Sequence, residues 1–295
     1  MLVKAFLDYL RYERNYSERT ITIYGTDVTQ FRNFVAERNI FDLTEIKPEG
    51  EIVREWIVSL MESGYATTSV NGKLSSLRSF YRYLLKQGKV TINPLWRITA
   101  PKSKKLLPIF LKESEMNRLL DETDFGEGYM ACRNRLIIEV FYVTGMRLFE
   151  LISLHDSDID FAASFIRVNG KRNKQRIIPF GDELKKEMLE YIDIRNEALL
   201  SNKPEAFFVR KNGEQLSRSI VGRIVRQSLS KVVTLKKKSP HVLRHTFATT
   251  MLNNEAELSV IKELLGHSSL TTTEIYTHMT FEKLKKIYKQ AHPRA

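Results

Sequence analysis

Three prolines interrupt the chain between residues 91 and 109, where the sequence reads TINPLWRITAPKSKKLLPI. Proline lacks a backbone N–H and its ring clashes with the preceding helical turn, so no continuous helix can run through this segment. Several lysines also make the segment basic. We therefore predict that residues 91–109 are a basic, extended linker between a domain at residues 1–90 and a second at residues 110–295. A chain of 295 residues is long enough for two hydrophobic cores.

Residues 1–90 are predicted to form a small bundle of four helices, because apolar residues recur in them at the spacing of one helix face. Ser17 is suited to cap the second helix. Pro48 is suited to open the third, and Gly64 and Gly88 to end the third and fourth. Basic and hydroxyl residues on these helices could position phosphates, although an ordinary solvated helix face has the same composition. They are Arg19, Thr20, Thr22, Lys73, Ser75, Ser76, Arg78 and Arg82.

Residues 110–295 mix helical and strand patterns. Helical patterns occupy residues 113–123, 132–145, 147–154, 182–200 and 217–231. The runs DIDFAASFIRV and QRIIPF have the length and alternation of paired strands, and AFFV is predicted to be a third short strand. The predicted fold class is therefore mainly α, with a small antiparallel β-sheet in the C-terminal domain.

The net charge of +12 and the isoelectric point near 9.6 favour an anionic partner, most simply nucleic acid or an acidic membrane surface. A generally basic protein without such a partner is the alternative. No apolar run has the length of a membrane span and the N-terminus lacks a signal-peptide pattern, so we expect a cytoplasmic protein that does not enter a membrane. Cys132 is the single cysteine, which excludes internal disulfides and cysteine-based zinc sites; it is expected to be a reduced core thiol.

The stretch 240–276 concentrates groups that suit an anionic substrate and an oxygen nucleophile. Pro240 opens a predicted helix that carries two histidines and an arginine on one face. A second helical pattern ends at Gly266, and a histidine and a tyrosine follow it. These groups are His241, Arg244, His245, His267 and Tyr276.

Two motifs further upstream could complete such a site. In TGMRLFEL, Arg147 lies near a helix N-terminus, where backbone N–H groups favour an anion, and Glu150 can orient the guanidinium. An Arg–Glu pair on a helix is, taken alone, more often structural. In NGKRNKQRIIP, Asn169-Gly170 indicates a hairpin turn, and a lysine at its tip could reach a neighbouring site. The alternative is a basic hairpin that faces only solvent.

A metal site is not predicted. His241 and His245 have the spacing of a zinc-binding helix and His267 could be a third ligand. The glutamate of the HExxH motif is absent, however, and Arg244 would place a positive charge beside the ion. The acidic run DSDID is not a calcium loop, because a phenylalanine and an arginine stand where that loop needs glycine and glutamate.

A phosphodiester explains the same groups better. Attack at phosphorus builds negative charge on the equatorial oxygens, which two arginines can hold. A tyrosine nucleophile needs a cationic environment and a proton acceptor, and a lysine can protonate the departing oxygen. This chemistry needs no metal and no cofactor.

The motifs TGMRLFEL, GKRNKQRIIP, HVLRHTFAT, LLGHSSLTTTEIYTH and HPRA together resemble the tyrosine recombinase (phage integrase) family, and within it the bacterial Xer type. The resemblance covers essentially the whole chain. It implies a two-domain clamp on double-stranded DNA, made of a helical-bundle core-binding domain and a mixed α+β catalytic domain. It also implies a site-specific recombinase that cuts and rejoins DNA through a covalent 3′-phosphotyrosine.

The resemblance assigns a role to each motif residue. Tyr276 would be the nucleophile and Lys171 the general acid for the 5′ oxygen. His241 would be the acid/base partner and His267 would hydrogen-bond the phosphate, whereas His245 would be structural. The full implied catalytic set is Arg147, Lys171, His241, Arg244, His267 and Tyr276.

The resemblance further implies a tetramer, of identical or paralogous protomers, on two DNA sites. After Tyr276, an apolar stripe in FEKLKKIYKQ predicts a helix that could fold back on its own domain; in the family it docks on a neighbouring protomer. The expected role is resolution of chromosome dimers at cell division, and a DNA translocase as activator is left open. The alternatives are an integrase or resolvase of a mobile element, a type IB topoisomerase, and a DNA-binding protein that does not cleave.

Overall fold

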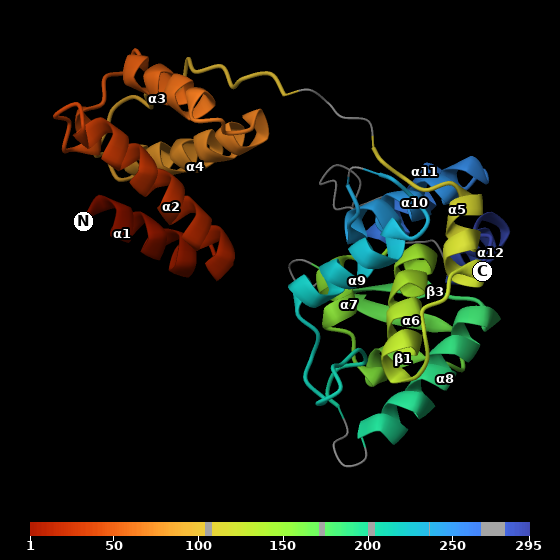
Figure 1. Cartoon of the computed structure of the whole chain (residues 1–295). Helices are drawn as coiled ribbons and strands as arrows, with labels where there is room; N and C mark the ends of the chain where they lie inside the picture. Colours follow the sequence, from red (N-terminus) through yellow and green to blue (C-terminus); the bar gives the residue numbers. More distant parts are fainter. Residues whose placement is uncertain (104–107, 171–174, 200–203, 236, 267–280) are drawn as a thin grey trace. The chain divides into compact units, whose positions relative to one another are not determined.

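The computed structural model describes residues 1–103, 108–170, 175–199, 204–235, 237–266 and 281–295 (Figure 1). The chain divides into two compact units, Met1–Leu106 and Leu107–Ala295, and each has its own hydrophobic core. Helices predominate and the sheet is small and antiparallel, which confirms the predicted fold class. In the part of the chain that the structure describes, no helix is both long and apolar enough to span a membrane.

The first unit is a bundle of helices, as the apolar spacing predicted. Ser17 caps the second of them, because its Oγ accepts a hydrogen bond from the backbone N–H of Thr20 at 3.3 Å. Gly64 and Gly88 follow the last two helices with φ of 79° and 64°, in the left-handed region that glycine adopts without strain. The elements are α1 (Leu2–Asp8), the π-helical η1 (Tyr9–Glu13), α2 (Glu18–Ala36), the 3-10 turn η2 (Leu43–Glu45), α3 (Glu51–Glu62) and α4 (Thr67–Lys86).

The prediction that Pro48 opens the third helix is wrong. α3 begins at Glu51, after Gly50, whose φ is 72°. A Cβ at Gly50 would lie 2.7 Å from the carbonyl oxygen of Pro94 and 2.9 Å from the side chain of Ile98. The close approach of these two residues therefore requires glycine at this position, and it sets the start of the helix one turn later than the proline suggests.

The core of the first unit extends into the stretch that the sequence suggests is a linker. Trp56 and Phe31 meet edge to face, with ring centroids 5.0 Å apart, at the centre of the bundle. Leu95 and Ile98 belong to the same buried cluster. Asn71 of α4 also donates a hydrogen bond to the carbonyl oxygen of Pro101 at 3.0 Å. Residues 91–101 thus add apolar surface and a hydrogen bond to the first unit.

The second unit is built around α6, which is buried along almost its whole length and packs against α8, α9 and α10 (Figure 1). The helices predicted in this part of the chain are present. The elements are α5 (Glu113–Asn117), the π-helical η3 (Arg118–Glu122), α6 (Tyr129–Thr144), α7 (Leu148–Ile152), the 3-10 turn η4 (Asp156–Asp158), β1 (Ile159–Asp160), β2 (Phe165–Asn169), β3 (Gln175–Pro179), α8 (Asp182–Leu199), α9 (Arg218–Ser230), α10 (Pro240–Asn253), α11 (Leu258–Leu265) and α12 (Phe281–Ala291).

The sheet has the order β1-β2-β3, and both pairs are antiparallel. The predicted hairpin of β2 and β3 is confirmed, but the prediction that AFFV is a strand is wrong. Residues 206–209 form a buried connection that makes one isolated bridge, between Val209 and Gln215. Burial alone explains why these four residues are apolar. The run does not alternate between apolar and polar residues, so the sequence cannot distinguish a strand from a buried loop here.

The C-terminal helix α12 folds back on its own unit. Leu284, Tyr288 and Ala291 form its buried face, and the hydroxyl of Tyr288 donates to the carbonyl oxygen of Val143 at 3.2 Å. His292 follows the helix and is buried between the rings of neighbouring aromatic residues. Its Nδ1 accepts from a backbone N–H and its Nε2 donates to the carbonyl oxygen of Tyr142 at 3.2 Å, which fixes a neutral tautomer.

A partly buried cluster of carboxylates and guanidiniums holds the end of the chain. Its members are Asp121, Arg135, Glu139, Glu183, Glu187 and Arg294. Oxygens of Glu139, Glu183 and Glu187 lie within 4.8 Å of one another, so these groups could hold a metal ion. Arg135 and Arg294 already form ion pairs with these carboxylates, and that pairing neutralises much of the charge a cation would meet.

Glu139 gives the unit a predicted pH dependence. Burial, and then a hydrogen bond and charge from Glu187, raise the pKa of Glu139 to about 9. The folded chain therefore binds a proton at this site that the unfolded chain has already released, so stability must fall as the pH rises toward 9. Between about pH 7.5 and 9 we expect the free energy of unfolding in urea to fall by about 1–2 kcal/mol.

The matched variant is Glu139→Gln, which keeps an acceptor for Arg294 but does not titrate. Its unfolding free energy should be nearly constant over the same pH range. His292 does not interfere, because burial lowers its pKa to about 4 and it is neutral in both states in this range. Equal slopes for the two proteins would contradict the assignment.

Candidate active site

The site begins where α6 ends. Gly145 stops the helix with φ of 57°, and Arg147 precedes the first turn of α7. The backbone N–H of Arg147 donates to Oε2 of Glu150 at 2.7 Å, and one of its terminal side-chain nitrogens donates to Oε1 at 2.8 Å. Glu150 is 4% exposed. The expectation that Glu150 orients the guanidinium of Arg147 is therefore confirmed.

A second arginine reaches the same place from α10, which begins at Pro240 as predicted. The guanidinium of Arg244 donates to the carbonyl oxygens of Gly145 and Leu265, each at 2.6 Å. Arg147 donates to the next carbonyl oxygen, that of Gly266, at 2.8 Å. Two arginines from distant parts of the sequence thus meet at the last turn of α11, where unsatisfied carbonyls carry partial negative charge.

A third arginine, which sequence reasoning missed, completes the group. Arg176 of β3 donates from Nε to the carbonyl oxygen of Leu264 at 2.6 Å, and it holds both carboxylate oxygens of Glu150 at 2.8 Å. Only part of this could be expected from the sequence, because alternation places Arg176 on the same strand face as the apolar Ile178. The register of the sheet then places it opposite the buried Val168, so the arginine points toward the interior.

Positive charge exceeds negative charge among these side chains, which favours the binding of an anion. Burial acts to raise the pKa of Glu150, but the hydrogen bond and charge of Arg176, and then those of Arg147, outweigh it and lower the pKa to about 2. Burial, followed by the charges of Arg147 and Arg176, lowers the pKa of Arg244 to about 10. Two guanidiniums therefore share one buried carboxylate, and the charge of a third lies close to them. A phosphate beside these arginines would reduce their mutual repulsion.

Two of the three histidines predicted for the site lie in the part of the chain that the structure describes. His241 and His245 are both exposed on α10, near Arg244 on the same helix. Burial, and then the charges of Lys237, His245 and Arg244, lower the pKa of His241, which favours the neutral imidazole. Three further predicted site residues lie outside the described residues, and they are Lys171, His267 and Tyr276.

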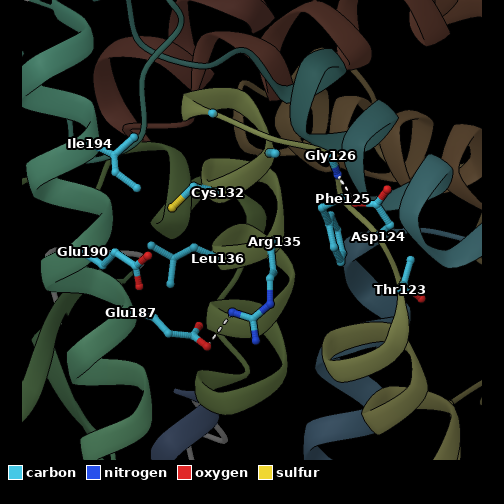
Figure 2. Close-up of a pocket in the computed structure, with 12 residues that line it drawn as sticks. Thr123, Asp124, Phe125, Gly126, Cys132, Arg135, Leu136, Glu187, Glu190 and Ile194 are labelled. Carbon is cyan, nitrogen blue, oxygen red and sulfur yellow. Dashed lines mark hydrogen bonds and ion pairs between the residues drawn. The ribbon is translucent and has the colours of Figure 1, made fainter.

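A cavity in the second unit lies away from these arginines (Figure 2). It measures about 360 Å³ and is lined by the α6 residues Cys132, Arg135 and Leu136, which face Glu187 and Glu190 of α8. None of the predicted site residues lines it. Cys132 is half-buried at its edge, not in the core as expected, and burial raises the pKa of its thiol.

Some of the basic and hydroxyl residues that suggested a phosphate-positioning surface on the first unit have structural partners instead. Asp27 is buried, accepts a hydrogen bond from Ser76 at 2.7 Å and forms an ion pair with Lys73 at 3.1 Å. Arg78 donates to the carbonyl oxygen of Ile98 at 2.7 Å. The residues of the set that remain exposed are Arg19, Thr22, Ser75 and Arg82.

Comparisons with known proteins identify the class. Residues 109–283 match the Phage integrase family, and residues 3–88 match the N-terminal SAM-like domain of phage integrases. Tyrosine recombinase XerC of Chlorobaculum tepidum is 37% identical and is matched over 98% of this chain and 94% of its own. The same enzyme of Halalkalibacterium halodurans is 38% identical over 99% of this chain and 97% of its own. The chain therefore belongs to the phage integrase family of tyrosine recombinases.

Solved structures show the same fold. The crystal structure of the XerH site-specific recombinase bound to difH substrate, in a pre-cleavage complex, matches 96% of this chain and 83% of its own, with a TM-score of 0.71 and 24% identity. A lambda integrase dimer bound to a COC′ core site matches 92% of this chain and 95% of its own, with a TM-score of 0.68 and 22% identity. By its family, the protein is a site-specific DNA recombinase that cuts and rejoins double-stranded DNA, as the sequence motifs predicted.

Proposed function

We propose that this recombinase acts through a covalent 3′-phosphotyrosine formed by Tyr276. The observation that carries the proposal is the meeting of Arg147 and Arg244 at the last turn of α11. In the sequence, His267 stands two residues after Leu265, the last residue of α11, and Tyr276 follows His267. Two arginines held at this point provide the positive charge and the planar donors that suit the scissile phosphate beside the nucleophile.

The proposed step is a transesterification. The phenol oxygen of Tyr276 forms a bond to phosphorus, and the bond from phosphorus to the 5′ oxygen breaks. Lys171 gives its proton to the departing 5′ oxygen, while His241, as the neutral base that its lowered pKa favours, takes the phenol proton. His267 hydrogen-bonds a non-bridging oxygen, and Arg147 and Arg244 stabilise the charge that develops there. Religation is the same step in reverse and needs no metal or cofactor.

The two units are proposed to divide the work. The helical unit would bind the DNA core site, and the unit that begins after the linker would carry catalysis, so that the two clamp one duplex. Four identical or paralogous protomers would assemble on two sites, with α12 exchanged between neighbours.

We place the enzyme in the cytoplasm, where it would resolve chromosome dimers at cell division. The relatives named XerC favour this role over that of a mobile-element integrase.

The test is a nicked suicide substrate, which traps the protein on DNA once the short cleaved fragment diffuses away. The protein should form an adduct that resists denaturation, and peptide mapping should place the DNA on Tyr276. Tyr276→Phe should bind the substrate but form no adduct. Absence of adduct with the unaltered protein on any DNA site recovered from its genome would overturn the proposal. The sequence of the attached DNA separates a chromosomal site from the end of a mobile element.

A further inference from the structure

Arg176 links three parts of the second unit that meet at the catalytic group. It lies on β3, its carboxylate partner lies on α7, and its carbonyl partner, Leu264, lies in the last turn of α11. The Arg176 side chain is 10% exposed. All three of its guanidinium nitrogens are used in these bonds, and two of them form the planar bidentate pair with Glu150 that arginine favours.

The same carboxylate also orients Arg147. Oε1 of Glu150 accepts from both guanidiniums, each at 2.8 Å, so the two arginines compete for one acceptor. With Arg176 in place, Arg147 has a single side-chain bond to Glu150 and sends its other terminal nitrogen to the carbonyl oxygen of Gly266. Arg176 thereby prevents the guanidinium of Arg147 from forming its own bidentate pair with Glu150.

The packing of Arg176 extends to the residue that ends α11. Gly266 has φ of 63°, and a Cβ built on it would lie 3.0 Å from a terminal nitrogen of Arg176. The guanidinium therefore lies directly against the backbone of Gly266 while it holds the carbonyl of Leu264. Both contacts hold the end of α11 in position, and from there the chain continues toward His267.

We propose that Arg176 is a positioning residue, which holds Arg147 and the end of α11 in the arrangement that cleavage requires. The inference rests on the proposed function, because it assigns Arg147 to the scissile phosphate. Without Arg176, the buried carboxylate of Glu150 would lose its bidentate guanidinium partner, and Oε2 would keep only the backbone N–H of Arg147. The guanidinium of Arg147 would turn to form a second side-chain bond to Glu150, since a buried charge with too few partners is costly, and would withdraw N–H groups from the phosphate.

The test compares Arg176→Gln with a matched control, Arg195→Gln. Arg195 is still more buried, with a side chain that is 2% exposed, and it also forms a bidentate pair, with Asp156 at 2.7 and 2.8 Å. It donates to a backbone carbonyl too, that of Phe207. The hydrogen bonds of its side chain go to Asp156, Asn196 and Phe207 and do not involve Arg147, so the two variants share the structural cost of losing a buried arginine and differ in the link to Arg147.

The measurement is the single-turnover rate of adduct formation on the suicide substrate at saturating DNA, together with the dissociation constant and the melting temperature. Arg176→Gln should cleave about 10²-fold more slowly, as expected when a catalytic group is displaced by about 1 Å, while its affinity for DNA changes by less than about threefold. Arg195→Gln should show a comparable fall in melting temperature and an unchanged rate. Arg176→Lys, which keeps the charge but loses the bidentate geometry, should fall between the two.

The outcomes separate the two proposals. Adduct formation by the unaltered protein with an unchanged rate in Arg176→Gln would overturn the positioning role and leave the proposed function standing. Equal loss of rate in Arg176→Gln and Arg195→Gln would assign Arg176 a purely structural role. No adduct with the unaltered protein would reject the proposed function itself.

Discussion

Arg147→Ala is expected to lower the rate of adduct formation at saturating DNA by about 10³-fold, because removal of one preorganised donor to a developing oxyanion has an effect of this size. The structure indicates a second reason for the rate to fall. The same side chain holds the carbonyl oxygen of Gly266 and one oxygen of Glu150. The rate should therefore fall at least as far as the loss of the phosphate contact alone would require.

Two variants test the specificity of this effect. Arg210→Ala removes a half-buried arginine of the same unit, whose ion pair with the exposed Glu214 lies at the surface, and should leave the rate unchanged. Arg147→Lys keeps the positive charge but cannot reach both Glu150 and Gly266, so it should restore only a small part of the rate. A rate for Arg147→Ala within tenfold of the unaltered protein would remove this residue from the proposed phosphate site.

Gly145→Ala should strongly lower the stability of the second unit. A Cβ at Gly145 would lie 2.4 Å from the ring of Phe247 and 3.0 Å from the side chain of Leu265, and φ is 57°. The left-handed conformation costs an L-residue about 1–2 kcal/mol, and overpacking of a buried site costs about 1–3 kcal/mol more. We expect a loss of roughly 3 kcal/mol in the free energy of unfolding, measured in urea.

Gly88→Ala is the matched control. Gly88 also follows a helix, α4, with a φ of 64°, but a Cβ there would meet no atom within 4 Å, so it should lose only the conformational part, about 1 kcal/mol. Since the carbonyl of Gly145 accepts from Arg244, any Gly145→Ala protein that still folds should also cleave more slowly. Equal losses of stability at the two glycines would show that the packing against Phe247 relaxes freely.

The sequence predicts the helices well where local signals and burial agree. The caps at Ser17, Pro240 and Gly266 are local hydrogen-bonding and dihedral requirements, so they can be recognised from a few neighbouring residues. Pro48 misleads because the start of α3 depends on Gly50 contacting Pro94 and Ile98, which are distant in sequence. AFFV misleads because its apolar character reflects burial, and burial does not specify a strand.

The candidate site is predicted unequally for a similar reason. Arg147 and Arg244 stand in motifs with recognisable composition, whereas Arg176 stands in a basic hairpin segment that resembles a solvated surface. Its role depends on the sheet register, which places it opposite Val168, and on the position of α11 beside the sheet. Neither can be derived from spacing along the chain. The roles of Lys171, His267 and Tyr276 remain predictions, because these residues lie outside the described part of the chain.

The arginines at the end of α11 bind main-chain oxygens, and this has a consequence for how the site tolerates change. Arg176, Arg244 and Arg147 take the carbonyls of three successive residues, Leu264, Leu265 and Gly266. An alanine scan of the two leucines would test core packing and leave all three acceptors in place. Insertion or deletion of one residue within α11 would rotate every acceptor by about 100° and disconnect all three arginines together. Length, more than side-chain identity, is what this helix must preserve.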